Sequence, residues 1–165
     1  MRKLMMLAFS ALFLLSLNAA NPKKHYTVIV SLDGFRWDYP AMYRTPNLDR
    51  MAADGVKAVM LPSYPASTFP NHYTLATGLV PDHHGIINNT FWDAKNKRQY
   101  SMGDSATRNN PEYYLGEPIW ITAQKQGIKT GNMYWVGADI AIKNAHPTYY
   151  LSLIHISEPT RRVVI

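Results

Sequence analysis

The hydrophobic positions of this chain fall into two kinds of segment. Three continuous apolar runs, at residues 26–32, 56–61 and 128–135, are typical of strands that are buried on both faces. Between them lie three stretches with helix signals, at residues 45–55, 71–78 and 118–127. Strands that alternate with helices predict an α/β fold with a mainly parallel sheet.

The ends of the expected helices are marked most clearly. Thr45 and Pro46 are typical of an N-cap and a first helical position, and Gly55 follows the last. Gly78 and Gly127 follow the other two helices in the same way. Three strands are few for a closed core, so we expect the domain to be incomplete.

Two side chains with metal and phosphate chemistry follow the first two strands. Asp33 comes directly after the run 26–32, and Thr68 lies just before the expected helix that begins at Asn71. Ligands of parallel sheets bind beyond the carboxyl ends of the strands, so both should face one crevice. A carboxylate and a hydroxyl there could hold a divalent metal and receive a phosphate. We therefore expect the Asp33 carboxylate and the Thr68 hydroxyl to lie within roughly 5 Å of each other.

Structural interpretations of the same residues remain open. Asp33 followed by glycine is typical of an ordinary turn, and Ser67 or Thr68 could act as the N-cap of the helix. His83 and His84 could bind a metal or could lie in an exposed turn.

The loop of residues 80–89 and the aromatic side chains add further candidates. The side-chain amide of Asn89 could donate a hydrogen bond to a phosphoryl oxygen. Trp92, Trp120, Tyr134 and Trp135 are expected to pack rather than to contact a substrate, and Tyr134 and Trp135 are the best candidates for an exception.

The first twenty residues are interpreted as a secretory signal peptide. Arg2 and Lys3 are followed by an apolar run at residues 4–17, and Ala19 and Ala20 are small residues suited to cleavage. The run is short for a membrane helix, so no stable membrane span is expected. The sequence contains no cysteine, which agrees with an exported, periplasmic or secreted protein without disulfide bonds.

The last fifteen residues, 151–165, are interpreted as a tail of non-native origin. Residues 151–161, LSLIHISEPTR, resemble the in-frame translation of a sequencing-library adapter, and the next codon would encode arginine, as at Arg162. A native hydrophobic strand followed by a turn is the alternative. On the first interpretation, residues 21–150 are the N-terminal part of a domain.

The positive charge does not indicate a nucleic-acid partner. Without the basic residues of the predicted signal and tail, 17 basic residues become 13, and without Glu158, 11 acidic residues become 10. The remaining lysines and arginines are scattered and form no arginine-rich stripe, so no nucleic acid is expected as a partner.

Several longer strings together resemble a known family. They are VSLDGFRWDY, TPNLDRMAADGV, PSYPASTFPNHYTLATGLVPDHHGI, NNTFWD and GEPIWITAQKQGIKTGNMYWVGADI. The chain resembles the nucleotide pyrophosphatase/phosphodiesterase family of the alkaline phosphatase superfamily. The resemblance implies a partial alkaline-phosphatase-like sandwich, truncated, and an exported zinc-dependent hydrolase of phosphodiester or pyrophosphate bonds.

The resemblance also implies a role for each candidate residue. Asp33 resembles a carboxylate ligand of one of two zinc ions, and Thr68 resembles the nucleophile, bound to the same ion. Asn89, with the backbone amide of Phe69, would hold a non-bridging phosphoryl oxygen. Phe69 and Tyr134 would lie near the leaving group or base of a small phosphodiester or nucleotide substrate.

The remaining metal ligands of the family come from the C-terminal half of the catalytic domain, which is absent from this sequence. We therefore expect the two-zinc site to be incomplete, and the isolated chain to be inactive and unstable. A phosphomonoester or phosphonate hydrolase of the same superfamily, or a non-catalytic ligand-binding fragment, remains an alternative.

Overall fold

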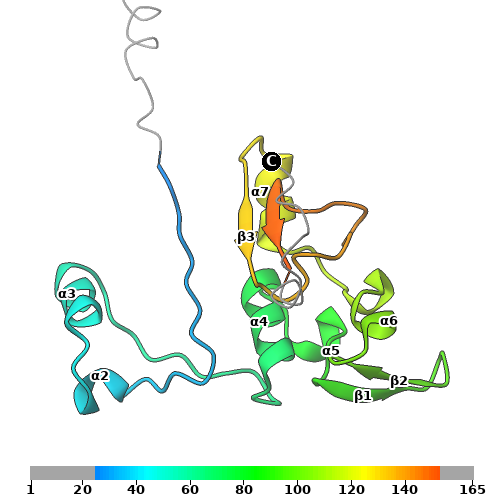
Figure 1. Cartoon of the computed structure of the whole chain (residues 1–165), viewed down its shortest axis with the longest axis horizontal. Helices are drawn as coiled ribbons and strands as arrows, with labels where there is room; N and C mark the ends of the chain where they lie inside the picture. Colours follow the sequence, from blue (N-terminus) through cyan, green and yellow to red (C-terminus); the bar gives the residue numbers. More distant parts are fainter. Residues whose placement is uncertain (1–24, 153–165) are drawn as a thin grey trace, which may run out of the picture. The chain divides into compact units, whose positions relative to one another are not determined.

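The computed structural model describes residues 25–152 (Figure 1). The chain divides into two compact units, residues 1–35 and 36–165, and each is described by itself. The predicted signal peptide lies outside the described residues, as does the predicted tail beyond Ser152. Within the described range, no helix has the length and apolar character needed to cross a membrane.

The described part of the first unit, residues 25–35, contains no helix or strand. Its backbone turns at Asp33 and Gly34, where the Phe35 N–H donates to the Leu32 carbonyl at 3.2 Å and Gly34 has φ +70°. The expected strand at 26–32 is therefore wrong for this structure. Its apolar side chains are exposed, and a strand forms only when its backbone groups pair with a neighbouring strand.

The second unit begins with two short helices, α2 (Tyr39–Met42) and α3 (Pro46–Asp54). Helix α3 confirms the sequence prediction at both ends, with Thr45 as N-cap and Gly55 as C-cap; the Gly55 N–H donates to the Met51 carbonyl at 3.0 Å. The expected strand at 56–61 is not formed, and Val59 and Leu61 within it are 62% and 87% exposed.

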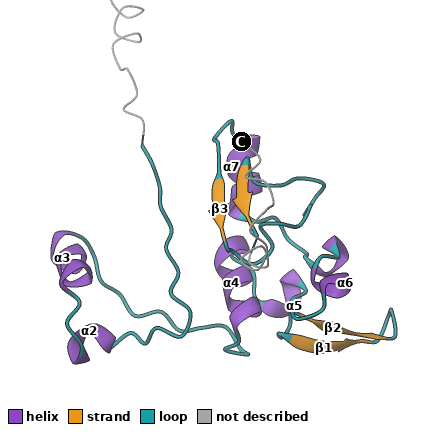
Figure 2. Ribbon diagram, in the orientation of Figure 1, coloured by secondary structure: helices purple, strands orange, loops and turns teal. Residues whose placement is uncertain are grey.

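The remaining elements follow between residues 68 and 151 (Figure 2). They are helices α4 (Thr68–Thr77) and α5 (Pro81–His84), strands β1 (Thr90–Asp93) and β2 (Arg98–Ser101), helix α6 (Ser105–Arg108), the short 3₁₀ helix η1 (Pro111–Tyr113), helix α7 (Ile119–Lys125), and strands β3 (Gly131–Met133) and β4 (Tyr149–Leu151).

The four strands form two small sheets. Strands β1 and β2 are an antiparallel hairpin, in which Thr90 is opposite Ser101. Strands β3 and β4 are parallel, with Gly131 opposite Tyr149. The expected strand at 128–135 is confirmed as the shorter β3, and the parallel pairing agrees with the predicted α/β class. The hairpin was not expected from the apolar pattern.

The core that supports these elements is rich in aromatic rings. The rings of Tyr73 and Tyr114 meet edge to face, with centroids 5.3 Å apart, and Phe91 stacks on Tyr100 at 4.6 Å. Tyr73 is fully buried, and its hydroxyl donates to the Leu115 carbonyl at 3.0 Å. Because Tyr73 lies at the centre of α4, this core fixes the position of that helix.

The tryptophans behave differently from one another. Trp120 of α7 is buried at 3% exposure, as expected for a packing residue. Trp92 of β1 is 65% exposed, so its expected packing role is wrong for this structure. The reason is the alternation of the strand, which places Phe91 toward the core and Trp92 on the opposite face.

The chain passes from α5 to β1 through a crowded turn at Gly85. This residue has φ +88°, and a Cβ atom there would lie 2.5 Å from the Tyr113 carbonyl oxygen. The adjacent Leu115 N–H donates to the His84 carbonyl at 2.9 Å, so two separate backbone segments run close together here. Only glycine fits both the space and the backbone conformation.

Candidate active site

Thr68 is the first residue of helix α4. The helix begins three residues earlier than the sequence predicted, because Pro70 falls in its first turn, where no backbone N–H needs an intrahelical partner. The hydroxyl therefore lies at a helix N-terminus, as expected, and it belongs to the helix rather than to the turn before it. The N–H groups of such a terminus favour an anion.

Ser67 is the N-cap residue, with φ −105° and ψ 156°, but its side chain makes no capping bond to the helix. Its hydroxyl instead donates to Oδ1 of Asn88, at 3.1 Å. The sequence left open whether Ser67 or Thr68 caps the helix with its hydroxyl, and the Ser67 hydroxyl does not.

The loop that leads into α4 is held by Asn71. Oδ1 of Asn71 accepts from the Ser63 N–H at 2.8 Å, and Nδ2 lies within 3.2 Å of the carbonyl oxygens of Ser63, Pro65 and Ser67. One side chain on the second turn of the helix therefore fixes five residues of preceding backbone. From the sequence, Asn71 is predicted only as the start of a helix, because these partners become neighbours only through the fold.

Asn89 contacts the first turn of the helix directly. The Phe69 backbone N–H donates to Asn89 Oδ1 at 2.9 Å. The structure thus brings together the two groups that the resemblance pairs as donors to a phosphoryl oxygen, at the residue next to Thr68. The Phe69 side chain is 7% exposed and belongs to the hydrophobic core.

Tyr134 lies directly after β3, with its side chain 39% exposed. Its φ of +56° is unusual for a residue with a bulky side chain, and its N–H donates to the Leu151 carbonyl at 2.9 Å. The next residue, Trp135, donates from Nε1 to the His72 carbonyl of α4 at 3.0 Å. The end of β3 is thereby tied to the helix that carries Thr68.

Asp33 belongs to the first unit, in the exposed turn described above. The expected approach of its carboxylate to Thr68 joins the two units and stays a prediction. In the structure the Asp33 side chain is exposed, at a turn rather than at the end of a buried strand.

His84 is fully buried and has a structural role. The Ile86 N–H donates to Nδ1 at 3.2 Å, so Nε2 carries the proton and faces the Pro70 carbonyl at 3.2 Å and Thr74 Oγ1 at 3.0 Å. Burial lowers the pKa of His84 below its ordinary value of 6.5. The neighbouring His83 is exposed, so the pair does not converge on one ligand.

The described residues contain no cluster suited to a metal ion. Among residues 25–152, no three His, Cys, Asp or Glu side chains are grouped so that they could hold a metal ion. A structural zinc site has four ligands, and a catalytic site has three from protein. The described residues therefore do not form a closed zinc site.

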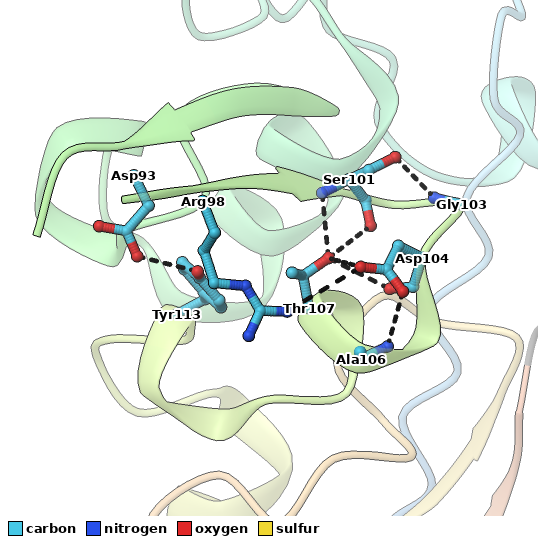
Figure 3. Close-up of polar contacts among 8 residues, drawn as sticks. All are labelled: Asp93, Arg98, Ser101, Gly103, Asp104, Ala106, Thr107 and Tyr113. Carbon is cyan, nitrogen blue, oxygen red and sulfur yellow. Dashed lines mark hydrogen bonds and ion pairs between the residues drawn. The ribbon is translucent and has the colours of Figure 1, made fainter. Parts of the chain in front are cut away.

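A second group of polar side chains lies on the β1–β2 hairpin and serves the fold (Figure 3). Tyr113 donates to Asp93 Oδ2 at 2.8 Å, and Asp93 also accepts from the side chain and backbone of Asn96. These hydrogen bonds, led by the Asn96 side chain, lower the pKa of Asp93 to about 2. The Asn96 bonds close the turn between the strands, and the Tyr113 bond ties η1 to the hairpin.

The same view shows how α6 is joined to β2 (Figure 3). The buried Thr107 hydroxyl accepts from the Ser101 N–H and lies 3.1 Å from the Ser101 carbonyl. Asp104 caps α6 by accepting from the Ala106 N–H at 3.0 Å. These residues fix a helix end and are not candidates for chemistry.

Residues 27–164 match the family model described as type I phosphodiesterase / nucleotide pyrophosphatase. The match continues through most of the segment interpreted above as adapter-derived, and that interpretation stays a prediction. The chain is similar to ectonucleotide pyrophosphatase/phosphodiesterase family member 1 of Homo sapiens, at 42% identity over 127 residues, covering 75% of this chain and 14% of the relative.

Two further relatives extend the comparison. The bis(5'-adenosyl)-triphosphatase enpp4 of Xenopus laevis is 37% identical over 147 residues, covering 88% of this chain and 31% of the relative. An inactive threonine-to-alanine variant of murine ectonucleotide pyrophosphatase/phosphodiesterase 5, solved in complex with AMP, has a TM-score of 0.67 at 37% identity; the match covers 73% of this chain and 33% of that one. The chain thus spans about a third or less of these relatives.

Proposed function

We infer, since the chain belongs to the type I phosphodiesterase / nucleotide pyrophosphatase family, that it is part of a hydrolase of phosphodiester or pyrophosphate bonds with Thr68 as nucleophile. The observation that carries this proposal is the 2.9 Å hydrogen bond between the Phe69 N–H and Asn89 Oδ1, next to Thr68 at a helix N-terminus. In this proposal the two groups lie within reach of one phosphoryl oxygen at the reacting hydroxyl.

The proposed reaction is an in-line attack of the Thr68 hydroxyl oxygen on phosphorus. A new bond forms between Oγ1 and phosphorus as the hydroxyl proton passes to solvent, the bond to the leaving oxygen breaks and the leaving group departs, and water later hydrolyses the threonine ester. That an inactive form of a 37% identical relative carries a threonine-to-alanine substitution supports a threonine nucleophile.

Asn89 and Phe69 would stabilise the negative charge that grows on a non-bridging oxygen. A phosphoryl oxygen that accepts the Phe69 N–H takes the place now held by Asn89 Oδ1. Asn89 can then present Nδ2 to the same oxygen by a half-turn about its last side-chain bond, which a planar amide allows. Two donors aimed at one oxygen form an oxyanion hole.

The substrate that we propose is a small phosphodiester or nucleotide. The AMP complex of the murine relative and the dinucleoside name of the Xenopus laevis relative support this class. The half-exposed Tyr134 ring, tied to α4 through Trp135, would contact the base or leaving group. We propose export to the periplasm or the cell exterior as the location of the enzyme.

We propose two zinc ions in the complete catalytic domain, with Asp33 and Thr68 as two ligands of one of them. The resemblance implies that the other ligands come from the C-terminal half of the catalytic domain, so the 165-residue chain alone should not hydrolyse the substrate. The protein to test is the extended protein, defined here as this chain continued from Tyr150 by the rest of the source gene's catalytic domain.

The experiment is hydrolysis of a chromogenic phosphodiester by the purified extended protein, with and without a chelator. Turnover that a chelator abolishes and zinc restores supports the proposal, and Asp33→Asn should lower zinc affinity at least about 10-fold in a metal titration. A chromogenic monoester is assayed in parallel. Preference for the monoester, or chelator-resistant turnover, would overturn the assignment.

A further inference from the structure

Asn88 makes two hydrogen bonds to the residues that flank the candidate site. Its Oδ1 accepts from the Ser67 hydroxyl at 3.1 Å and from the Asn89 backbone N–H at 2.8 Å. A side-chain amide oxygen has two lone pairs, so both are in use. Asn88 therefore connects the residue before Thr68 to the residue whose side chain contacts Phe69.

These contacts close a ring around Thr68. From Ser67 the chain runs through Thr68 to Phe69, whose N–H donates to Asn89 Oδ1 at 2.9 Å. Asn89 is bonded in turn to Oδ1 of Asn88, which returns to the Ser67 hydroxyl. Two hydrogen bonds join the segment 67–69 to the segment 88–89. They leave Asn89 little freedom to move relative to Thr68.

The bond from Ser67 explains why the N-cap hydroxyl does not cap. A serine at this position usually accepts a bond from the second or third residue of the helix. Here the hydroxyl donates outward to Asn88, and the Phe69 N–H is satisfied by Asn89 instead. The start of α4 is thus capped by the loop that precedes β1, and helix and loop are held in register.

We propose that Asn88 is a positioning residue, which sets the distance and direction of the Asn89 side chain relative to the Thr68 hydroxyl. This inference rests on the proposed function, because it concerns the geometry of the same reaction. Since only Oδ1 is used in these bonds, an aspartate keeps both acceptor positions and an alanine removes them.

The test is steady-state kinetics of the extended protein with the chromogenic phosphodiester. Asn88→Ala should lower kcat about 10-fold or more with little change in KM, because misplacement of a catalytic group affects the transition state more than binding. Asn88→Asp should retain kcat within about threefold. Asn109→Ala, at an exposed asparagine after α6, is the matched control and should behave as the wild type.

A double-mutant cycle separates positioning from loss of fold. Ser67→Ala removes the other end of the same bond, so Ser67→Ala combined with Asn88→Ala should cost about as much as Asn88→Ala alone, rather than the product of the two. In the extended protein, amide exchange at Asn89 should accelerate in Asn88→Ala and stay unchanged in Asn109→Ala.

The possible outcomes distinguish this inference from the proposed function. If Thr68→Ala abolishes turnover but Asn88→Ala leaves kcat unchanged, Asn88 is not a positioning residue and the proposed function stands. The inference is also overturned if Asn88→Asp has a kcat as low as that of Asn88→Ala. It is overturned too if the losses of kcat from Ser67→Ala and Asn88→Ala multiply in the double variant. If Thr68→Ala remains fully active, the proposed function itself fails.

Discussion

The start of α4 and the turn at Asp33, each within its own unit, are held in different ways. Thr68 follows a loop bonded to Asn71, and its neighbours Ser67 and Phe69 are bonded to Asn88 and Asn89. Asp33 lies in a turn closed by a bond between its own neighbours, Phe35 and Leu32. A helix start can be fixed by loop amides of its own unit, whereas a strand end depends on the sheet that receives the strand.

The largest expected effect is on the α4 side of this comparison. In the extended protein, Thr68→Ala should lower kcat/KM on the order of 10⁴-fold or more, as for other deleted nucleophiles, because the bond-forming oxygen is removed. Stopped and steady-state assays with the chromogenic phosphodiester measure it. Thr68→Ser, which keeps an oxygen, is the control and should retain far more activity.

Loss of the neighbouring amide should cost less than loss of the nucleophile. Asn89→Ala removes one proposed oxyanion donor and should lower kcat about 10²–10³-fold. Asn109→Ala serves again as the comparison. Equal kcat for wild type and Asn89→Ala would remove Asn89 from the site and leave the Phe69 N–H as the donor.

The difference in packing between the two units can be measured by stability. In the extended protein, Ile86→Ala should lower the free energy of unfolding by about 2–5 kcal/mol, because Ile86 is fully buried. Val30→Ala should change it by about 0.5 kcal/mol or less, since Val30 is 75% exposed. Urea titrations followed by circular dichroism give both values. A Val30→Ala cost similar to that of Ile86→Ala would show that the first unit is packed.

The smallest effect concerns pH and His84. Burial lowers the pKa of His84 in the folded state, so near and below its ordinary value of 6.5 the unfolded chain binds a proton that the folded chain does not. Stability should therefore fall as the pH drops through 6.5 toward the folded-state pKa. Urea midpoints measured between about pH 8 and about pH 5 give the slope. His84→Gln should lower stability at all pH values and flatten the slope; an unchanged slope would assign it to other groups.

The sequence predicted the helices better than the strands, for physical reasons. Helix α3 carries its own start and stop at Thr45, Pro46 and Gly55, and a helix satisfies its backbone internally. The runs 26–32 and 56–61 have strand composition, but a strand also needs a partner, and no described strand pairs with either. Composition alone does not supply that partner.

The candidate site shows the same division. Thr68 and Asn89 were predicted, and the structure joins Asn89 to the residue after Thr68. The parts played by Asn71 and Asn88 could not be read from the sequence, since each depends on a partner at the other end of a loop. A pair of adjacent asparagines before a strand is typical of any turn, and only the fold shows which oxygen each one offers.

The crowded turn at Gly85 limits how this region can change during evolution. Any other residue there would bring a Cβ to 2.5 Å from the Tyr113 oxygen in a left-handed backbone, whereas at Gly78, with φ +69°, a Cβ would meet nothing within 4 Å. A substitution at Gly78 would cost only backbone strain, so asparagine is tolerated at that position. No other residue fits at position 85 unless η1 moves. In a library of functional variants of this domain, glycine should therefore be retained at position 85 far more often than at position 78.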